Sequence, residues 1–484
     1  MKNFKIYIIA LFLFGVLYSC ENELDVLPND AQTEVDFLND PNNAIQLVNG
    51  IYSIMLQWDM YSFSWIGLTS ITSDDADKGS TPGDTGSDKN KLDALNFESN
   101  MASLNDVWNS RYAAIYRANN ALFYLEQLSI EESLKNRLIG ETRFLRGLMY
   151  FDLVRCFGGV PVVTSKIDIN DLETVNKVVS VRKSVEEVYA QIEEDLADAV
   201  TRLPNKSEYK SEDLGRATKG AAMGLLAKAY LYQKKWQKAF DKSGELINSG
   251  QYSLLENYAD VWKEIGENGT ESIFEIQATL NKGLQGYTDV QGGRGTPDYG
   301  WGFNSPSLTL ANSYEPGDSR RGATIIFVPS TLWDGFEAPN SWNNPRYNYK
   351  SYQSNTAESW NGNKSETAKN LRILKYSDVL LIRAEAALQL GNAGEAISNV
   401  NALRTRAGLN PKTSITLQQL YDERRWELAM EHDRWFDLVR TGQAVEKMAV
   451  DGKTFKTGTH EVFPIPADQI TQSGGRLLQN PGYN

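Results

Sequence analysis

Histidine and cysteine are almost absent from this sequence. The chain has two of each among 484 residues. The histidines, His432 and His460, lie far apart without cysteines beside them, whereas a catalytic triad or a zinc site needs close companions. Two cysteines cannot form a disulfide framework, so the folded core must hold the protein together unaided. These absences exclude most nucleophile-and-base catalysts and histidine–cysteine metal sites.

Long apolar runs and excess positive charge are also missing. The apolar run at residues 6–17 falls short of the ~20 residues that a membrane-spanning helix needs, and no later stretch is longer. Sixty-two acidic residues against 49 basic ones give a net charge of −13. A surface this acidic repels phosphate backbones. We therefore expect no membrane-spanning helix and no nucleic-acid partner.

The N-terminus carries an export signal. Lys2 and Lys5 form a basic head, the apolar run follows, and Leu17-Tyr18-Ser19-Cys20 resembles the lipobox of bacterial lipoproteins. We predict a lipoprotein signal peptide at residues 1–19 and lipid attachment at Cys20. The alternative is an ordinary signal peptide with a chance cysteine at its end. On the lipoprotein interpretation, one domain at residues 20–484 works outside the cytoplasm, tethered to a membrane.

Most of the remaining sequence predicts helices, in portions at about 35–280 and 372–445. Small and bulky residues recur there at the offsets of a tetratricopeptide repeat, where small side chains let two helices approach closely. One unit has Ala227, Tyr230, Trp236 and Ala239, and another has Ala384, Ala387, Ala393 and Ala396. A third unit would pair residues 146–150 with a helix at 185–201. The alternative for each unit is a generic helical hairpin.

Residues 281–371 differ, being rich in Gly, Asn, Ser and Pro with little periodicity. Loops this long are usually functional or disordered, and the many aromatic residues disfavour disorder. Because sugar rings stack on flat aromatic faces, we predict ligand-binding residues here and in an N-terminal polar loop, although each could instead be core. The insertion supplies Trp301, Trp333, Trp342, Trp360, Tyr287, Tyr299 and Arg346, and the N-terminal part supplies Trp65, Asp74 and Asp75.

Carboxylates invite two further hypotheses. Residues 423–440 carry alternating charges, among which Glu427 and Glu431 could serve as the acid and base of a glycosidase. Alternating charges at helical spacing more often form ion pairs that fix a helix, and we favour that interpretation. The Asp-rich stretch at residues 74–88 permits a calcium ion but has no recognised ligand spacing.

Several segments together resemble the SusD/RagB family of outer-membrane nutrient-binding lipoproteins. They occur in the family's order at residues 117–121, 140–163, 216–236, 373–409, 423–442, 463–470 and 479–483. The lipobox-like segment also stands where the family has one. The loop regions match poorly.

The resemblance implies a mainly α-helical fold, in which four tetratricopeptide-like units pack against a loop-rich ligand-binding portion. It also implies a surface-exposed, lipid-anchored outer-membrane protein without enzymatic activity or cofactor. Its ligand would be an oligosaccharide, delivered to a SusC-like TonB-dependent transporter. A peptide-binding member of the same architecture is the alternative, and a carboxylate-dependent glycosidase is a more distant one.

Overall fold

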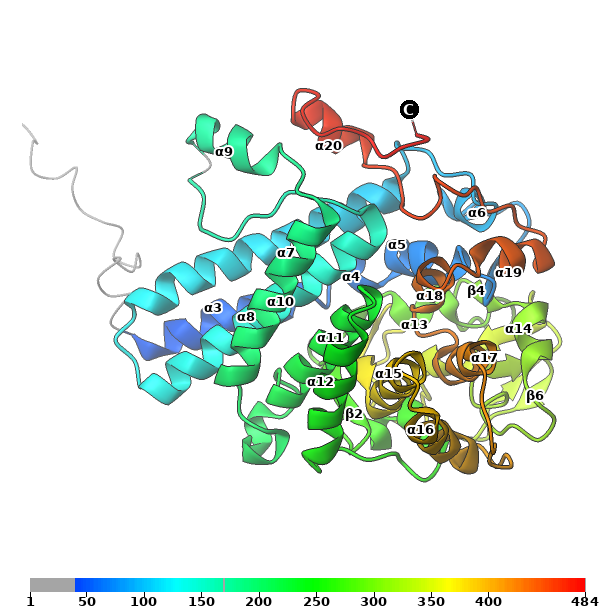
Figure 1. Cartoon of the computed structure of the whole chain (residues 1–484). Helices are drawn as coiled ribbons and strands as arrows, with labels where there is room; N and C mark the ends of the chain where they lie inside the picture. The colour runs from blue at the N-terminus through cyan, green and yellow to red at the C-terminus, as the bar shows by residue number, and fades with distance from the viewer. Residues whose placement is uncertain (1–39, 169, 484) are drawn as a thin grey trace, which may run out of the picture.

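The computed structural model describes residues 40–168 and 170–483, and most of them lie in helices (Figure 1). The predicted signal peptide and Cys20 fall outside these residues. Within them, no helix is both long and apolar enough to cross a bilayer. The main helices are α3 (Pro41–Ile54), α7 (Ala102–Gln127), α8 (Glu132–Phe157), α10 (Val185–Arg202), α11 (Lys219–Tyr232), α12 (Trp236–Asn248), α15 (Tyr376–Gln389), α16 (Ala393–Arg406) and α17 (Leu417–Leu428).

These helices stack in sequence, as a repeat architecture requires. α8 packs on α10, α10 on α11, α11 on α12, α12 on α15 and α15 on α16. The three predicted units are therefore confirmed as the helix pairs α8–α10, α11–α12 and α15–α16. Consecutive pairs also share a core, since Ala227 and Ala239 of one unit pack with Ala386 of the next.

Local sequence explains where these helices begin and how closely they approach. Ser184 and Glu187 form a reciprocal capping box at the start of α10. Gly147 of α8 faces Leu196 of α10 so closely that an added Cβ would lie 3.1 Å from the leucine side chain. A larger residue at that position would require the Leu196 side chain to shift by a few tenths of an ångström.

Short strands in the predicted insertion, at its borders and in the N-terminal part of the chain pair two by two among the described residues. All pairs are antiparallel: β2 (Ser272–Ile276) with β10 (Leu371–Lys375), β3 (Leu284–Gln285) with β9 (Glu366–Thr367), β5 (Ile325–Phe327) with β8 (Arg346–Asn348), β6 (Ser330–Thr331) with β7 (Glu337–Ala338), and β1 (Ala76–Gly79) with β4 (Phe303–Pro306). The last pair joins the N-terminal part of the chain to the insertion. This long-range pairing positions the site described below.

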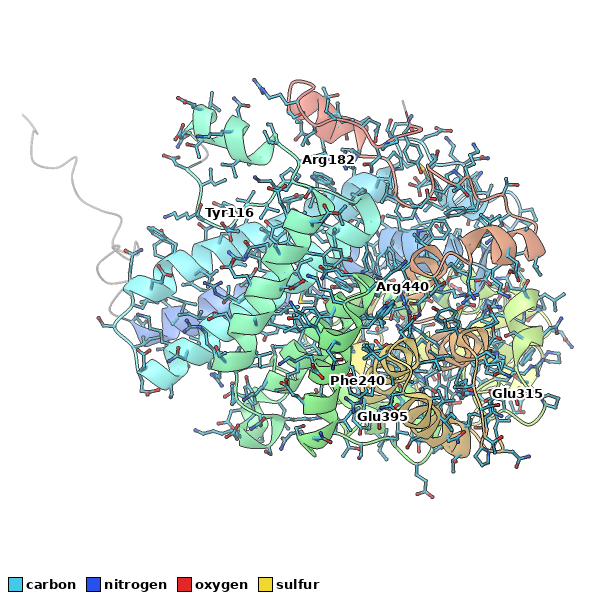
Figure 2. All side chains as sticks on the ribbon, in the orientation of Figure 1. Tyr116, Arg182, Phe240, Glu315, Glu395 and Arg440 are labelled. Carbon is cyan, nitrogen blue, oxygen red and sulfur yellow. The ribbon has the colours of Figure 1, made fainter. Side chains whose placement is uncertain are left out.

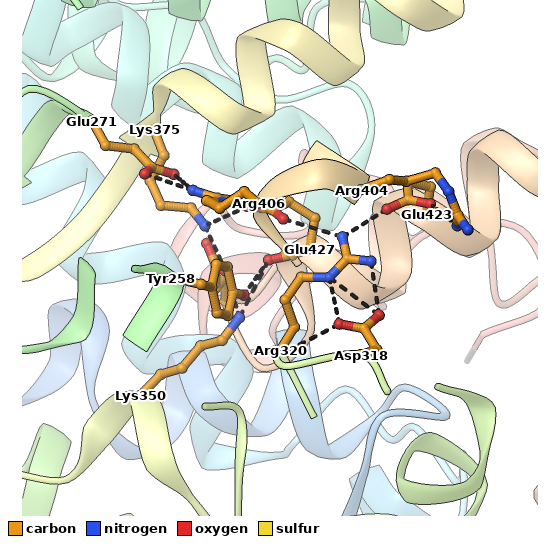
Figure 3. Close-up of polar contacts among 11 residues, drawn as sticks. Tyr258, Glu271, Asp318, Arg320, Lys350, Lys375, Arg404, Arg406, Glu423 and Glu427 are labelled. Carbon is orange, nitrogen blue, oxygen red and sulfur yellow. Dashed lines mark hydrogen bonds and ion pairs between the residues drawn. The ribbon is translucent and has the colours of Figure 1, made fainter. Parts of the chain in front are cut away.

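The charged block of residues 423–440 forms a buried network of ion pairs (Figure 3). Arg320, which is fully buried, lies 2.7 Å from Glu423 and 3.3 Å from Glu427. Arg406 bridges Glu427, at 2.5 Å, and Glu271, at 2.7 Å. These contacts tie α17 to α16 and to the insertion. The interpretation of the charged block as a set of ion pairs that fixes its helices agrees with this geometry.

Candidate functional site

A cleft of about 730 Å³ opens where the N-terminal segment meets the insertion. We call it the Trp301 cleft. Its walls come from the beginning of α5 (Phe63–Ile66), the loop after β1, the segment at residues 294–303 and the loop that contains Asn343. The lining residues are Phe63, Asp84, Gly86, Ser87, Arg294, Gly295, Thr296, Asp298, Gly300, Trp301, Phe303 and Asn343.

Aromatic rings form the apolar part of the Trp301 cleft. Trp301 is 38% exposed, and its ring packs against Trp58, with centroids 5.4 Å apart, and edge-on to Phe63 at 5.9 Å. Phe63 in turn packs on Phe303 at 4.8 Å. Such contacts hold a ring in one orientation. Trp301 therefore presents a fixed, partly exposed aromatic surface to the cleft.

Backbone geometry keeps this surface open. Gly86 has φ +56°, and an added Cβ would lie 2.6 Å from the Phe303 ring. Gly302 has φ +76° and accepts a hydrogen bond at its carbonyl from the N–H of Ser80, with 2.5 Å between the atoms. Both positions suit glycine because positive φ strains other residues. The two glycines let the N-terminal loop approach the strand that follows Trp301.

An arginine–carboxylate pair forms the polar edge of the cleft. Arg294 donates hydrogen bonds of 2.5 Å from Nη1 to Ser80 Oγ and to Asp84 Oδ2. Burial alone would raise the pKa of the Asp84 carboxyl, but hydrogen bonds from Arg294, the Gly86 N–H and Ser80 lower it below its usual range. Asp84 therefore stays ionised and fixes the guanidinium at the cleft.

Other polar residues that line the cleft are more exposed. The Asp298 side chain is 63% exposed and pairs with Lys364 at 2.6 Å. Asn343 is exposed and is held by its backbone N–H, which donates to the Arg294 carbonyl at 2.9 Å. Aromatic rings beside hydrogen-bonding side chains suit a ligand with both apolar faces and hydroxyl groups.

Of the predicted ligand-binding residues, the structure places Trp301 alone on the wall of this cleft. Tyr299 is half-buried behind it: its ring stacks on Tyr352 at 5.4 Å, and its hydroxyl donates to the Gln353 carbonyl at 2.5 Å. Trp342 is 5% exposed and donates its indole N–H to the Pro297 carbonyl at 2.9 Å. These two residues support the cleft loops from within.

Three predicted residues lie at the surface or half-buried outside the cleft. Trp333 is 37% exposed beneath the Lys263 ammonium, which is 4.8 Å from the ring centroid. Trp360 is half-buried in the loop before β9. Arg346 is half-buried and donates from Nε to the Pro306 carbonyl at 2.7 Å. Whether any of them contacts a ligand stays a prediction.

Four other predicted residues lie in the interior, which argues against direct contact with a ligand. Trp65 is 3% exposed and covered by Arg111, whose guanidinium is 4.3 Å from the ring centroid. Asp74 and Asp75 are buried, and each pairs with an arginine of the charged block. The pairs are Asp74 with Arg434 and Asp75 with Arg425, both at 2.7 Å.

The fourth interior residue is Tyr287, whose hydroxyl lies 3.1 Å from Nε2 of buried His432. Burial lowers the pKa of His432 to about 3, so this imidazole is neutral. In each of the four cases, contacts within the folded interior, and not access to a ligand, account for the aromatic or acidic residue.

Phe63, Phe303, Arg294 and Asp84 line the cleft but were not predicted. Phe303 stands two positions after Trp301, so alternation along a strand could have suggested it. Arg294 lies between two glycines in the aperiodic insertion, where no sequence pattern distinguishes it. The β1–β4 pairing brings Phe63 and Asp84 to the site, and no pattern in the sequence around either residue indicates this pairing.

The carboxylates proposed for hydrolysis sit in a different environment. Burial would raise the pKa of Glu427, but the nearby Arg406, Lys375 and Arg320 outweigh burial and lower it to about 2. A general acid must be protonated at working pH and reach its substrate. Glu427 is ionised and buried, and Glu431 is held by Lys350 at 2.6 Å and Lys375 at 2.9 Å.

Among the described residues, no group of three or more histidines, cysteines and acidic residues is placed to hold a metal ion. In the Asp-rich stretch, Asp74, Asp75, Asp84 and Asp88 each pair with a cationic side chain. Their negative charge is therefore already compensated. A calcium ion stays a prediction.

Comparison with known proteins gives one consistent result. Residues 24–231 match the family model "Starch-binding associating with outer membrane", and residues 328–483 match that of the SusD family. SusD-like protein P25 of Formosa agariphila is 27% identical over 99% of this chain and 98% of its own length.

Solved structures agree with these matches. A laminarin-binding SusD-like protein is 30% identical, with a TM-score of 0.78 over 92% of this chain and all of its own. Surface glycan-binding protein A of Bacteroides thetaiotaomicron, solved with laminarihexaose, has a TM-score of 0.76 at 23% identity and so supports the fold alone. With its stacked helix pairs, its loop-rich insertion and these matches along its length, the chain belongs to the SusD family.

Proposed function

We propose that this protein binds a neutral oligosaccharide in the Trp301 cleft. The observation that carries the proposal is the partly exposed Trp301 ring, held by Trp58 and Phe63 beside a fixed Arg294. A sugar ring would stack its C–H face on the indole, while Arg294 donates hydrogen bonds to its hydroxyl oxygens and the Asp298 carboxylate accepts them from its hydroxyl groups. Preformed sites of this kind lose little entropy on binding.

A β-glucan of the laminarin type is the first ligand to test. The 30% identical relative is described as laminarin-binding, and the two chains align over almost their whole lengths. The cleft volume of about 730 Å³ accommodates a short oligosaccharide segment rather than a single ring. We propose binding without catalysis, since the candidate carboxylates Glu427 and Glu431 are buried in ion pairs.

We further propose that the protein is anchored to the outer membrane through lipid on Cys20, exposed at the cell surface, and delivers its ligand to a SusC-like TonB-dependent transporter. The lipobox-like segment and the family membership support this role. In cells, Cys20→Ala should release the protein from the membrane fraction, while the purified soluble domain keeps its ligand affinity. Membrane retention of the Cys20→Ala protein would contradict lipid anchoring.

Calorimetric titration of the purified mature protein tests the ligand class. We expect binding to laminari-oligosaccharides or another glycan of a neutral panel, with no release of shorter products over hours. Binding of peptides and of no glycan would overturn the proposal in favour of the peptide-binding alternative. Progressive shortening of the glycan would overturn the non-catalytic part.

A further inference from the structure

A second pocket lies apart from the Trp301 cleft, between α7, α9 (Leu172–Val179) and α20 (Ala467–Gln472). We call it the α7–α9 pocket, and it shares no lining residue with the cleft. Its volume is about 250 Å³, the space of roughly eight waters at ~30 Å³ each. This size suits a single ring. None of the described residues that line it is charged, although 23% of the chain is.

An unpaired hydrogen-bond donor reaches this pocket. Trp108 of α7 is 4% exposed and lines the pocket, and its indole N–H donates to none of the other described residues. The indole N–H is therefore available to donate a hydrogen bond to an occupant of the pocket.

The amides around Trp108 are held in place yet keep unused hydrogen-bonding groups. Gln469 donates from Nε2 to the Oδ1 atoms of Asn105, at 2.8 Å, and Asn109, at 2.9 Å. Its Oε1 and the Nδ2 of Asn109 keep their capacity for a ligand. Arg476 donates to Asn176 Oδ1 at 2.9 Å, and because arginine only donates, Asn176 Nδ2 is also available.

The remaining wall is apolar, and the structure holds it firmly. Tyr112 packs its ring against Trp108 at 5.1 Å and anchors its hydroxyl on the Pro161 carbonyl at 2.7 Å. Arg182, three residues after α9, donates to the Leu478 carbonyl at 2.8 Å and to Asn480 Oδ1 at 2.6 Å. α9 is thus tied to the C-terminal segment on the far side of the pocket.

An aromatic row on α7 extends outward from the pocket. Trp108, Tyr112 and Tyr116 recur every four residues, so they lie on one helix face about 6 Å apart along the axis. Tyr116 is 52% exposed, and Figure 2 shows it on the side of the helical layer that carries α9. Aromatic faces at this spacing, beside uncharged amides, match successive rings of a neutral glycan and not a charged ligand.

We infer that the α7–α9 pocket is a second saccharide site, which takes a terminal neutral sugar unit in the pocket while the next unit stacks on Tyr116. The site goes beyond the proposed function, because it uses other elements and does not require the Trp301 cleft. Two sites on one tethered protein raise the effective concentration of a long glycan at each site.

The indole N–H resonance of Trp108 provides a direct test. We would record nitrogen–proton correlation spectra of the mature Trp301→Ala protein, assign the signal with Trp108→Phe, and titrate with laminarihexaose and maltohexaose. At millimolar sugar, we expect the Trp108 signal to shift and to saturate. Asn176 and Gln472 both line the pocket with their amides, so the double variant Asn176→Ala/Gln472→Ala should weaken this binding at least about tenfold, as should the single variant Tyr116→Ala.

Leu280→Ala is the control, because Leu280 is 47% exposed and lies outside both sites. If the wild-type protein binds the sugar but the Trp108 signal of the Trp301→Ala protein does not shift, the second site is overturned and the proposed function is left intact. A shift that the Asn176, Gln472 and Tyr116 variants leave unchanged would also overturn it. If the pocket variants abolish sugar binding and Trp301→Ala does not affect it, the result would support the α7–α9 pocket as a binding site and contradict binding in the Trp301 cleft.

Discussion

Arginine–carboxylate pairs occur in two regions of this protein with different consequences. Around α17, Arg320 meets Glu423 and Glu427 with every side chain fully buried. At the Trp301 cleft, Arg294 and Asp84 form a similar pair with side chains 36% and 32% exposed. The buried pairs are fixed from all sides, whereas the cleft pair keeps hydrogen-bonding capacity toward solvent. Burial, more than residue type, separates structural charges from candidate ligand-binding charges.

The largest expected effect is in the buried network. Arg320→Leu leaves Glu423, Glu427 and Asp318 without their shared partner, and such uncompensated buried charge costs about 3–5 kcal/mol. Urea denaturation should show a loss of this size in the free energy of unfolding. A loss below about 1 kcal/mol would mean that the network is not the structural element that we describe.

Acid should weaken the same network. Because the folded-state pKa of Glu427 is lowered from 4.5 to about 2, its stabilising contribution is present above pH 4.5 and is lost as the pH falls toward 2. The difference in unfolding free energy between wild type and Glu427→Gln should therefore shrink across this range. A difference that stays constant from pH 5 to pH 2 would contradict the ionised state.

At the cleft, a substitution should reduce ligand affinity more than it reduces the free energy of unfolding. Arg294→Ala removes a charged donor, which is worth about 1.5 kcal/mol, or roughly tenfold in affinity. Its effect on stability should stay within about 1 kcal/mol because the pair is partly exposed. Arg321→Ala is the matched control, since Arg321 is exposed in the same insertion but does not line the cleft. Equal affinities of the two variants would show that Arg294 does not contribute to ligand binding.

The smallest effect is expected for Asp84→Asn. The amide keeps the shape of the side chain but loses the charge that fixes Arg294, so affinity should fall less than in Arg294→Ala. Thermal unfolding should change little. A larger loss of affinity than for Arg294→Ala would indicate that Asp84, and not the arginine, contacts the ligand directly.

Local patterns predicted the helical part of the molecule well. Alanines at repeat spacing identified α11–α12 and α15–α16, because close approach of two neighbouring helices requires small residues within one short segment. The capping box of Ser184 and Glu187 likewise depends on residues three positions apart. Features of this kind depend on residues within a few helical turns of one another, so the sequence alone can predict them.

The candidate site could be predicted only in part. Trp301 and Trp342 look alike in sequence, yet one is 38% exposed and the other 5%. The difference arises from packing against residues far along the chain, such as Trp58, and from the pairing of β1 with β4. Long-range contacts also explain why the acidic pair at Asp74 and Asp75 is structural.

The central claim is that Trp301 forms the binding surface, and one measurement tests it most directly. The affinity of Trp301→Ala for the glycan identified by titration should be compared with that of Leu308→Ala, whose leucine is 58% exposed near the same strand but outside the cleft. We predict at least a tenfold, or about 1.4 kcal/mol, loss for Trp301→Ala and wild-type affinity for Leu308→Ala. Unchanged affinity of a folded Trp301→Ala protein would contradict the account.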